Sequence, residues 1–182
     1  MEVTAKNLDE TIQKLKAKSA RLKDMTPAFK AFGSFLEKGT DDCFQNSADW
    51  DGNAFDDLAV STIDARIAKA GGFKRTKSGK FTKGARKKQA AMAATGGIKI
   101  LVDTARARNS QHTEASKDSL KWSAIGYIGP HITGSETVVG RPPKRNVSPF
   151  EKVGGAWKLN IKANAELNRL VVKHIRGEGS VA

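Results

Sequence analysis

The chain has 182 residues, 38% of them hydrophobic, and its 32 Lys and Arg against 19 Asp and Glu give a formal charge of +13. This length allows one domain with a long arm or insertion, and the low apolar fraction indicates that part of the chain stays outside the core. The charge favours polyanionic partners, whereas no run approaches the roughly 18 apolar residues of a membrane span. The single Cys43 excludes an internal disulfide, and the first residues lack a signal-peptide pattern, so we expect synthesis in a reducing cytoplasm.

Two helices are predicted at the start of the chain. The first, over about residues 5–24, has one face formed by Leu8, Ile12, Leu15, Ser19 and Leu22. The second starts at Thr26-Pro27, which suits a helix N-terminus, and is expected to end at Gly39. Its inward residues are Phe29, Phe32, Phe35 and Leu36, and Gly33 indicates close packing. Together these helices predict a helical hairpin that serves the core.

An acidic, turn-rich stretch over 39–60 follows, and a helical patch is expected at 61–70. The acidic residues are Asp41, Asp42, Asp49, Asp51, Asp56 and Asp57. They form either a cation site or a solvated, turn-forming loop. Because the spacing and closing Glu of a calcium loop are missing, the solvated loop is favoured.

A basic segment lies over 71–97 and is predicted to be a flexible loop. Its cations are Lys74, Arg75, Lys77, Lys80, Lys83, Arg86, Lys87 and Lys88, with no acid among them. Such a segment buries too little apolar surface to offset its ordering entropy. It is either a solvated loop or one that becomes ordered on a partner, with the cations contacting phosphates and Phe73 and Phe81 stacking on bases.

Residues 98–110 begin with the period-2 pattern of a half-buried strand. Asp103 and Thr104 suit the cap of a helical turn, and that turn carries Arg106 and Arg108. Further along, a strand is expected over 120–128, with Gly126 and Gly129 as close-approach or bulge points. A short strand or hairpin is expected over 131–140, with Gly134-Ser135 in its turn. Three prolines make 141–150 an extended arm, and a last helix over about 161–176 places Ile161, Leu167, Leu170, Val171 and Ile175 on one side. This order predicts one α+β domain, in which an N-terminal helical hairpin and a C-terminal helix pack on a small antiparallel sheet.

Enzymatic chemistry finds no support in the sequence. His112, His131 and His174 lie in different segments, and none has a nucleophile or carboxylate at a telling spacing. The chain lacks the H-E-x-x-H, G-x-S-x-G, Walker A and dinucleotide-binding patterns. We therefore expect no enzyme, no metal and no cofactor.

The segment at 100–110 resembles the phage virion morphogenesis, or tail completion, family of tailed bacteriophages, which carries I-L-V-D-T-G-R-L-R-x-S. The matching residues are Ile100, Leu101, Val102, Asp103, Thr104, Arg106, Arg108 and Ser110, while Ala105 and Ala107 stand where the family has Gly and Leu. Upstream, Asp51-Gly52, Phe55, Leu58 and Ser61-Thr62 resemble its D-G-x-x-W-x-x-L-x-x-S-x-T run. Downstream, Pro143, Lys144, Arg145, Asn146 and Val147 resemble its P-A-R-P-F segment, but of its Y-A-x-x-H-x-x-G segment only Pro130-His131 offers a fragment.

This resemblance implies a structural virion protein of the neck or tail, forming a homo-oligomeric ring, hexameric in form, that caps the tail tube and docks it to the head connector. The implied partners are tail-tube or sheath protein, connector or neck proteins, and passing DNA, with no membrane. The implied subunit or partner contacts are Asp103, Thr104, Arg106, Arg108, Ser110, Arg141, Lys144 and Arg145. The alternative is a basic nucleic-acid-binding protein that uses the 74–88 loop for phosphate contacts.

Overall fold

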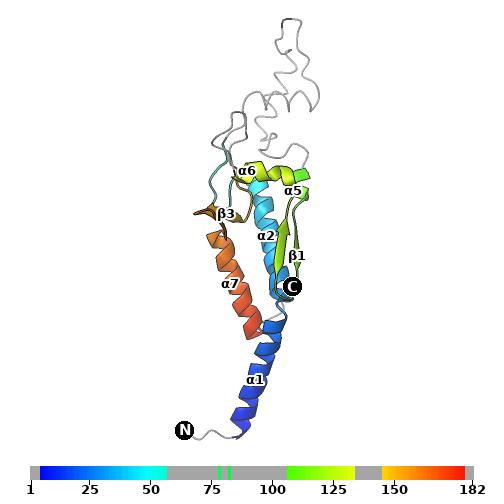
Figure 1. Cartoon of the computed structure of the whole chain (residues 1–182), viewed down its shortest axis with the longest axis vertical. Coiled ribbons are helices and arrows are strands. Elements are labelled where there is room, and N and C mark those ends of the chain that lie inside the picture. The colour runs from blue at the N-terminus through cyan, green and yellow to red at the C-terminus, as the bar shows by residue number, and fades with distance from the viewer. Residues whose placement is uncertain (1–4, 57–77, 79–81, 83–105, 134–144, 179–182) are drawn as a thin grey trace. The chain divides into compact units, whose positions relative to one another are not determined.

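The computed structural model describes residues 5–56, 78, 82, 106–133 and 145–178. They form an α+β fold of segregated helices and two short antiparallel hairpins (Figure 1). The chain divides into two compact units, one of residues 1–40, 111–124 and 148–182 (unit 1), the other of residues 41–110 and 125–147 (unit 2). Because both units consist of separated segments, neither can be excised at a single chain boundary.

Unit 1 contains the predicted helices at the two ends of the chain. The first helix, α1, spans Ala5–Lys23, and the last, α7, spans Ile161–Arg176, so both predictions are confirmed. The Asn160 side chain caps α7 by accepting a hydrogen bond from the Lys162 N–H at 2.9 Å. Gly177 ends the helix in the left-handed conformation at φ 75°, as a C-terminal glycine commonly does. Local caps thus fix both ends of α7.

The second helix, α2, spans Thr26–Asn46 and therefore runs past the end expected at Gly39. The Asp24 carboxylate accepts a hydrogen bond from the Thr26 N–H at 3.1 Å where this helix begins. Past Gly39, Thr40 donates to the Leu36 carbonyl at 2.8 Å, and Cys43 and Phe44 are 4% and 0% exposed. The prediction of a stop was wrong because burial of these side chains outweighs the cost of about 1 kcal/mol for Gly inside a helix.

The first hairpin packs against α2 within unit 1. It consists of β1 (His112–Ala115) and β2 (Leu120–Ser123), with Thr113 opposite Trp122. Glu37 Oε1 accepts hydrogen bonds from the N–H and the hydroxyl of Thr113 at 2.8 and 2.7 Å. Beside this contact a Cβ built on Gly33 would lie 2.5 Å from Thr113 Oγ1. Gly33 thus marks close packing as predicted, on a strand rather than on a helix.

The second hairpin has no counterpart in the sequence-based prediction. It consists of β3 (Phe150–Val153) and β4 (Ala156–Leu159), which form a sheet separate from the first. Gly154 and Gly155 make its two-residue turn with φ of 60° and 85°, values that glycine adopts without strain. The Trp122 and Phe150 rings pack edge to face with their centroids 6.1 Å apart, and this contact links the two hairpins.

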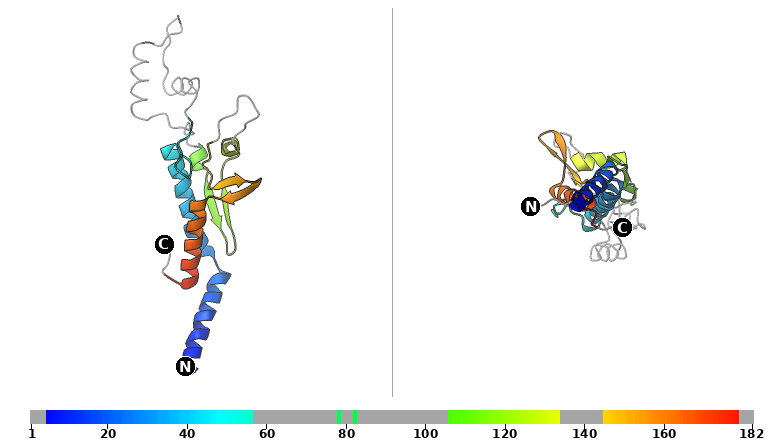
Figure 2. Two further views of the ribbon diagram at one scale, coloured as in Figure 1. Left: turned by 90° about the vertical axis from the view of Figure 1, so that its left-hand side faces the viewer. Right: turned by 90° about the horizontal axis from the view of Figure 1, so that it is seen from below.

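Helix α7 packs against the C-terminal end of α1. Arg21 Nη1 donates to the Ile175 carbonyl at 3.1 Å, and His174 Nε2 donates to the carbonyls of Arg21 and Asp24 at 3.1 and 2.9 Å. The rest of α1 leads away from α2, so the first two helices do not lie side by side as a hairpin (Figure 2). On α7, Leu170 is 2% exposed, but Ile161, expected on the same inward side, is 79% exposed.

The described part of unit 2 after α2 consists of short elements around buried apolar residues. After α2, a turn closed by the Ala48–Ala54 bridge leads to Phe55, which is 8% exposed. Then come α5 (Arg106–Asn109), the 3₁₀ helix η1 (Gly126–Ile128) and α6 (Gly129–Thr133). The strand predicted over 120–128 is therefore wrong beyond Ser123. Ile128 lies instead in the 3₁₀ helix η1, where its side chain is buried. Pro130 lies in the first turn of α6, where the missing N–H of proline removes no helical hydrogen bond.

Other predictions for this part of the chain have mixed outcomes. A Cβ added at Gly126 or Gly129 would meet nothing within 4 Å, and both glycines lie in helical turns, so the prediction of close-approach or bulge points there was wrong. Residues 145–149 contain no helix or strand, as expected for the Pro-containing arm. The strand or hairpin predicted over 131–140 is wrong at its start, because residues 131–133 belong to α6. Its remainder, the predicted helix at 61–70, the predicted strand at 98–102 and the first part of the arm at 141–144 lie outside the described residues.

Candidate interaction surfaces

The helical turn α5 places Arg108 against Asp41 in unit 2. Arg108 Nε donates to Asp41 Oδ1, and Nη2 donates to Oδ2 at 2.9 Å, so the guanidinium makes a two-pronged contact with the carboxylate. Both side chains are about one-third exposed, at 37% and 34%. Hydrogen bonding to Asp41 raises the pKa of Arg108 above its usual value, which keeps the pair charged. The resemblance implied Arg108 as a subunit or partner contact, and in the structure its guanidinium contacts a carboxylate of the same chain.

The other residues of this turn have different roles. Ala107 is 4% exposed and anchors the turn in the core, whereas Arg106 is exposed. The Ser110 hydroxyl donates to the Ala107 carbonyl at 2.9 Å and accepts from the Ile125 N–H at 3.1 Å. Ser110 therefore ties α5 to the segment that leads into η1. Of the residues predicted here as contacts, Arg106 presents its side chain to solvent.

Arg145 belongs to the interior of unit 2. Its side chain is 4% exposed, and Nη2 donates to the Asp56 carbonyl at 2.9 Å. Its N–H donates to the His131 carbonyl at 2.7 Å. The resemblance implied Arg145 as a subunit or partner contact, but its side chain is buried and its Nη2 binds an internal carbonyl. Long-range contacts of this kind leave no signal in the local sequence.

His131 lies beside Arg145. Burial lowers the pKa of His131 below its usual value, and the charge of Arg145 lowers it further. Its Nδ1 is buried and has no hydrogen-bond partner. A neutral imidazole fits this position better than an imidazolium, because a second charge there would face the guanidinium.

The acidic stretch folds into turns only after the end of α2, because Asp41 and Asp42 belong to that helix. Asp49 Oδ1 accepts from the N–H groups of Asp51 and Asn53 at 3.0 and 2.8 Å, and Oδ2 accepts from Asn53 Nδ2 at 3.0 Å. Partial burial acts to raise the pKa of Asp49, but the hydrogen bonds from Asn53, Asp51 and Gly52 outweigh it and lower that pKa. Across the described ranges no group of three His, Cys, Asp or Glu side chains is placed to hold a metal ion. Asp41 and Asp49 therefore act as structural acceptors.

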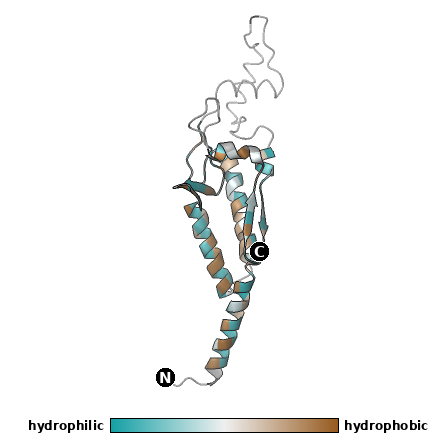
Figure 3. Ribbon diagram, in the orientation of Figure 1, coloured by the Kyte–Doolittle hydropathy of each residue, from teal (hydrophilic) through white to brown (hydrophobic). Residues whose placement is uncertain are grey.

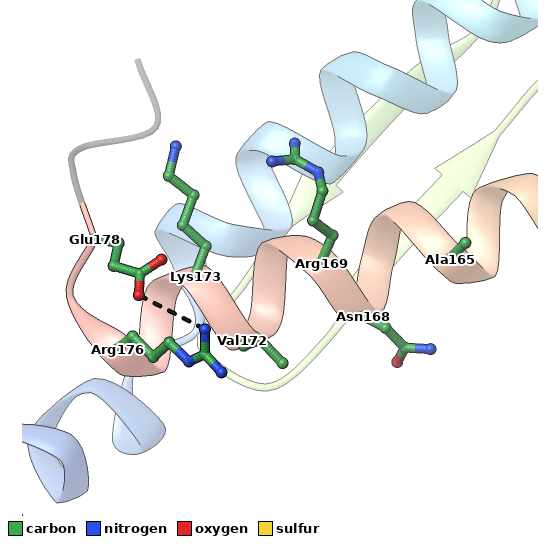
Figure 4. A pocket seen from close by; sticks show the side chains of 7 residues that line it. All are labelled: Ala165, Asn168, Arg169, Val172, Lys173, Arg176 and Glu178. Atoms are coloured by element: carbon green, nitrogen blue, oxygen red, sulfur yellow. Dashed lines mark ion pairs between the residues drawn. The ribbon is translucent and has the colours of Figure 1, made fainter.

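The second candidate surface, after the α5 turn, is an open hollow on α7 that is lined by cationic side chains. Figure 4 shows Arg169 and Lys173 projecting from the same side of the helix, one turn apart. Arg169 is neutralised by two hydrogen bonds to Glu166 at 2.6 and 2.7 Å, and Arg176 lies 3.7 Å from Glu178. Hydrogen bonding to Arg169 lowers the pKa of Glu166. Because carboxylates offset two of these cations, the hollow is a weak candidate for anion binding.

The exposed apolar residues of α1 form the third surface. Leu8, Ile12, Leu15 and Leu22 are 53%, 38%, 60% and 55% exposed. Figure 3 shows apolar residues recurring along this helix. The spacing alone predicted an inward face, whereas the structure leaves that face uncovered.

The remaining predicted contacts lie outside the described residues. They are Asp103, Thr104, Arg141, Lys144 and the basic-loop residues Lys74, Arg75, Lys77, Lys80, Lys83, Arg86, Lys87 and Lys88. No helix of the described segments is long and apolar enough to cross a membrane. Comparison with protein-family models, curated proteins and solved structures gives no match. The resemblance to the tail completion family therefore rests on the quoted segments of this sequence.

Proposed function

We propose that this chain is a structural virion protein of a tailed bacteriophage, a ring subunit that completes the tail tube and docks it to the head connector. The observation that supports it most is that the three family-like segments all contribute to unit 2. Their described parts are residues 51–56, 106–110 and 145–147, separated by up to about half of the chain in sequence. Segments that resemble one family and fold into one compact unit are what a shared structural core would require.

Hydrogen bonds connect the first and the third of these segments. Arg145 binds the carbonyl of Asp56, and Trp50 Nε1, next to the first segment, donates to the Val147 carbonyl at 3.1 Å. The turn at 106–110 buries Ala107 at a position where the family has Leu, so both residues suit an apolar environment. In this proposal most of the motif residues that the structure describes maintain the fold of the unit and do not touch partners.

Arg106 is the described residue of this motif that is best placed to meet a neighbour. Its side chain is exposed, while Arg108 on the same turn is paired with Asp41. An exposed guanidinium forms bidentate contacts with carboxylates or phosphates readily. In a ring it would face an acidic surface of the next subunit, or DNA in the channel.

The test is the size and shape of the purified particle. A ring predicts a mass near six times that of the 19.6 kDa chain by light scattering, and closed rings in negative-stain images. Genes for tail-tube, sheath or connector proteins beside its gene would support the same conclusion. A monomer that binds duplex DNA tightly at physiological salt, with affinity falling steeply as salt rises, would instead favour the nucleic-acid-binding alternative.

A further inference from the structure

The apolar residues of α1 follow a heptad pattern. Counting Ile12 and Ser19 as a positions places Leu8, Leu15 and Leu22 at d positions, with steps of four and three residues between them. Helix α1 contacts α7 at its C-terminal end, through Arg21, whereas Leu8, Ile12 and Leu15 lie in the part that leads away. A strict a/d stripe is narrower than the face of a helix that packs on a globular core, and it is typical of a coiled-coil seam. We propose that α1 of two copies of this chain pair with each other in antiparallel orientation.

The charged residues beside the apolar stripe favour a second copy of α1 as the partner and favour an antiparallel orientation of the two helices. Asp9, Lys16 and Lys23 occupy e positions, and Thr11 and Lys18 occupy g positions. In a parallel pair g faces e of the partner, which sets Lys18 against Lys23 twice. In an antiparallel pair e faces e, which sets Asp9 against Lys16 of the partner copy twice, and sets Lys18 against the uncharged Thr11. Antiparallel pairing therefore replaces two repulsions by two attractions.

The same arrangement also matches the apolar residues. With Ile12 opposite Leu15 of the partner copy, the two central layers consist of one β-branched and one leucine side chain each. Leu8 then lies opposite Ser19 of the partner copy, so that each serine faces a methyl-rich side chain and the two serines do not meet. A helix of 19 residues is about 28 Å long, which gives a small interface, so we expect weak association by α1 alone.

This inference does not rest on the proposed function. An antiparallel contact has a twofold axis and joins two chains, whereas a ring is closed by head-to-tail contacts between different surfaces. A failure of the ring would leave α1 dimers, and a failure of α1 pairing would leave rings. The two outcomes are separable in one sedimentation experiment.

Disulfide trapping tests the direction of pairing. Ser19→Cys and Leu8→Cys are placed in separate full-length chains, and the wild type, whose Cys43 is buried, serves as the background. An antiparallel pair predicts cross-linking when the two variants are mixed, and little when either is oxidised alone. Cross-linking of Ser19→Cys with itself would indicate a parallel pair and overturn the proposal. The proposal would also be overturned if the mixed variants cross-linked no more than the control Ala17→Cys, whose residue lies on the outer face at an f position.

Charge reversal tests the contacts. Asp9→Lys should weaken association about five- to tenfold, because it sets the new lysine against Lys16 of the partner copy twice. Glu10→Lys makes the same charge change at an outer f position and should leave association unchanged. The double change Asp9→Lys with Lys16→Asp should restore it. The proposal would be overturned if Asp9→Lys and Glu10→Lys had equal effects, or if the wild-type chain stayed monomeric at high concentration. It would also be overturned if α1 bound an added acidic amphipathic helix in place of a second copy of itself.

Discussion

Arg108 binds Asp41 across 67 positions of sequence, through Nε and Nη2 to the two carboxylate oxygens. This pair fixes the turn α5 to the last part of α2 within unit 2. Arg106, two residues earlier on the same turn, is exposed. Two arginines of one motif thus differ in their surroundings, since one is paired within the chain and the other is exposed.

The first prediction distinguishes these two arginines. Because the pair is partly exposed, Arg108→Gln and Asp41→Asn should each lower the thermal midpoint only slightly. Because the two side chains contact each other, the double variant should lose less than the sum of the two single losses. Arg106→Gln should leave the midpoint unchanged. Under the ring proposal, Arg106→Gln should instead reduce particle mass in light scattering. Equal thermal losses for Arg106→Gln and Arg108→Gln would contradict the assignment.

The second prediction concerns Arg145. Replacing it by Ala removes a buried guanidinium and its bond to the Asp56 carbonyl, and should cost about 2–3 kcal/mol of unfolding free energy. Arg145→Lys should recover part of this loss, since Lys keeps the charge but lacks the planar fork. Urea unfolding measures both. A loss of assembly without any loss of stability would show that Arg145 acts as a partner contact.

The third prediction concerns Gly33. Ala usually stabilises a helix interior by about 1 kcal/mol over Gly. Here the new methyl group would lie 2.5 Å from Thr113 Oγ1, and that hydroxyl is held by Glu37, so Gly33→Ala should destabilise by about 1–3 kcal/mol. Gly126→Ala, where nothing lies within 4 Å, is the matched control. A stabilised Gly33→Ala variant would mean that α2 and β1 are farther apart.

The fourth prediction concerns pH. The pKa of His131 is lowered in the folded chain, so the unfolded chain binds the proton more tightly and acid favours unfolding. The stabilisation is complete above the unfolded pKa of about 6.5 and is lost as the pH falls through it toward the folded value. His131→Gln should therefore show a smaller drop in thermal midpoint between about pH 7 and pH 5 than the wild type. An NMR titration that places the His131 pKa above 6.5 would refute the assignment.

The sequence predicted those elements whose determinants are local. Helices α1 and α7 were expected at nearly their observed bounds because the helical spacing of their apolar residues lies within the segments themselves. The second hairpin was missed although Gly154-Gly155 is a typical turn signal, since the prolines before it favoured an extended arm. The continuation of α2 was missed because Gly39 was read without the burial of Cys43 and Phe44.

The sequence by itself determined the α+β class, both terminal helices and the apolar stripe of α1, because propensity, capping and periodicity act within a few residues. Tertiary structure alone decided which side chains meet. Asp41 and Arg108, or Asp56 and Arg145, which are 89 positions apart, have no local pattern that connects them. It also decided that the apolar stripe of α1 is exposed, because the same spacing of leucines occurs in helices that are buried in a core and in helices that pair with a second copy.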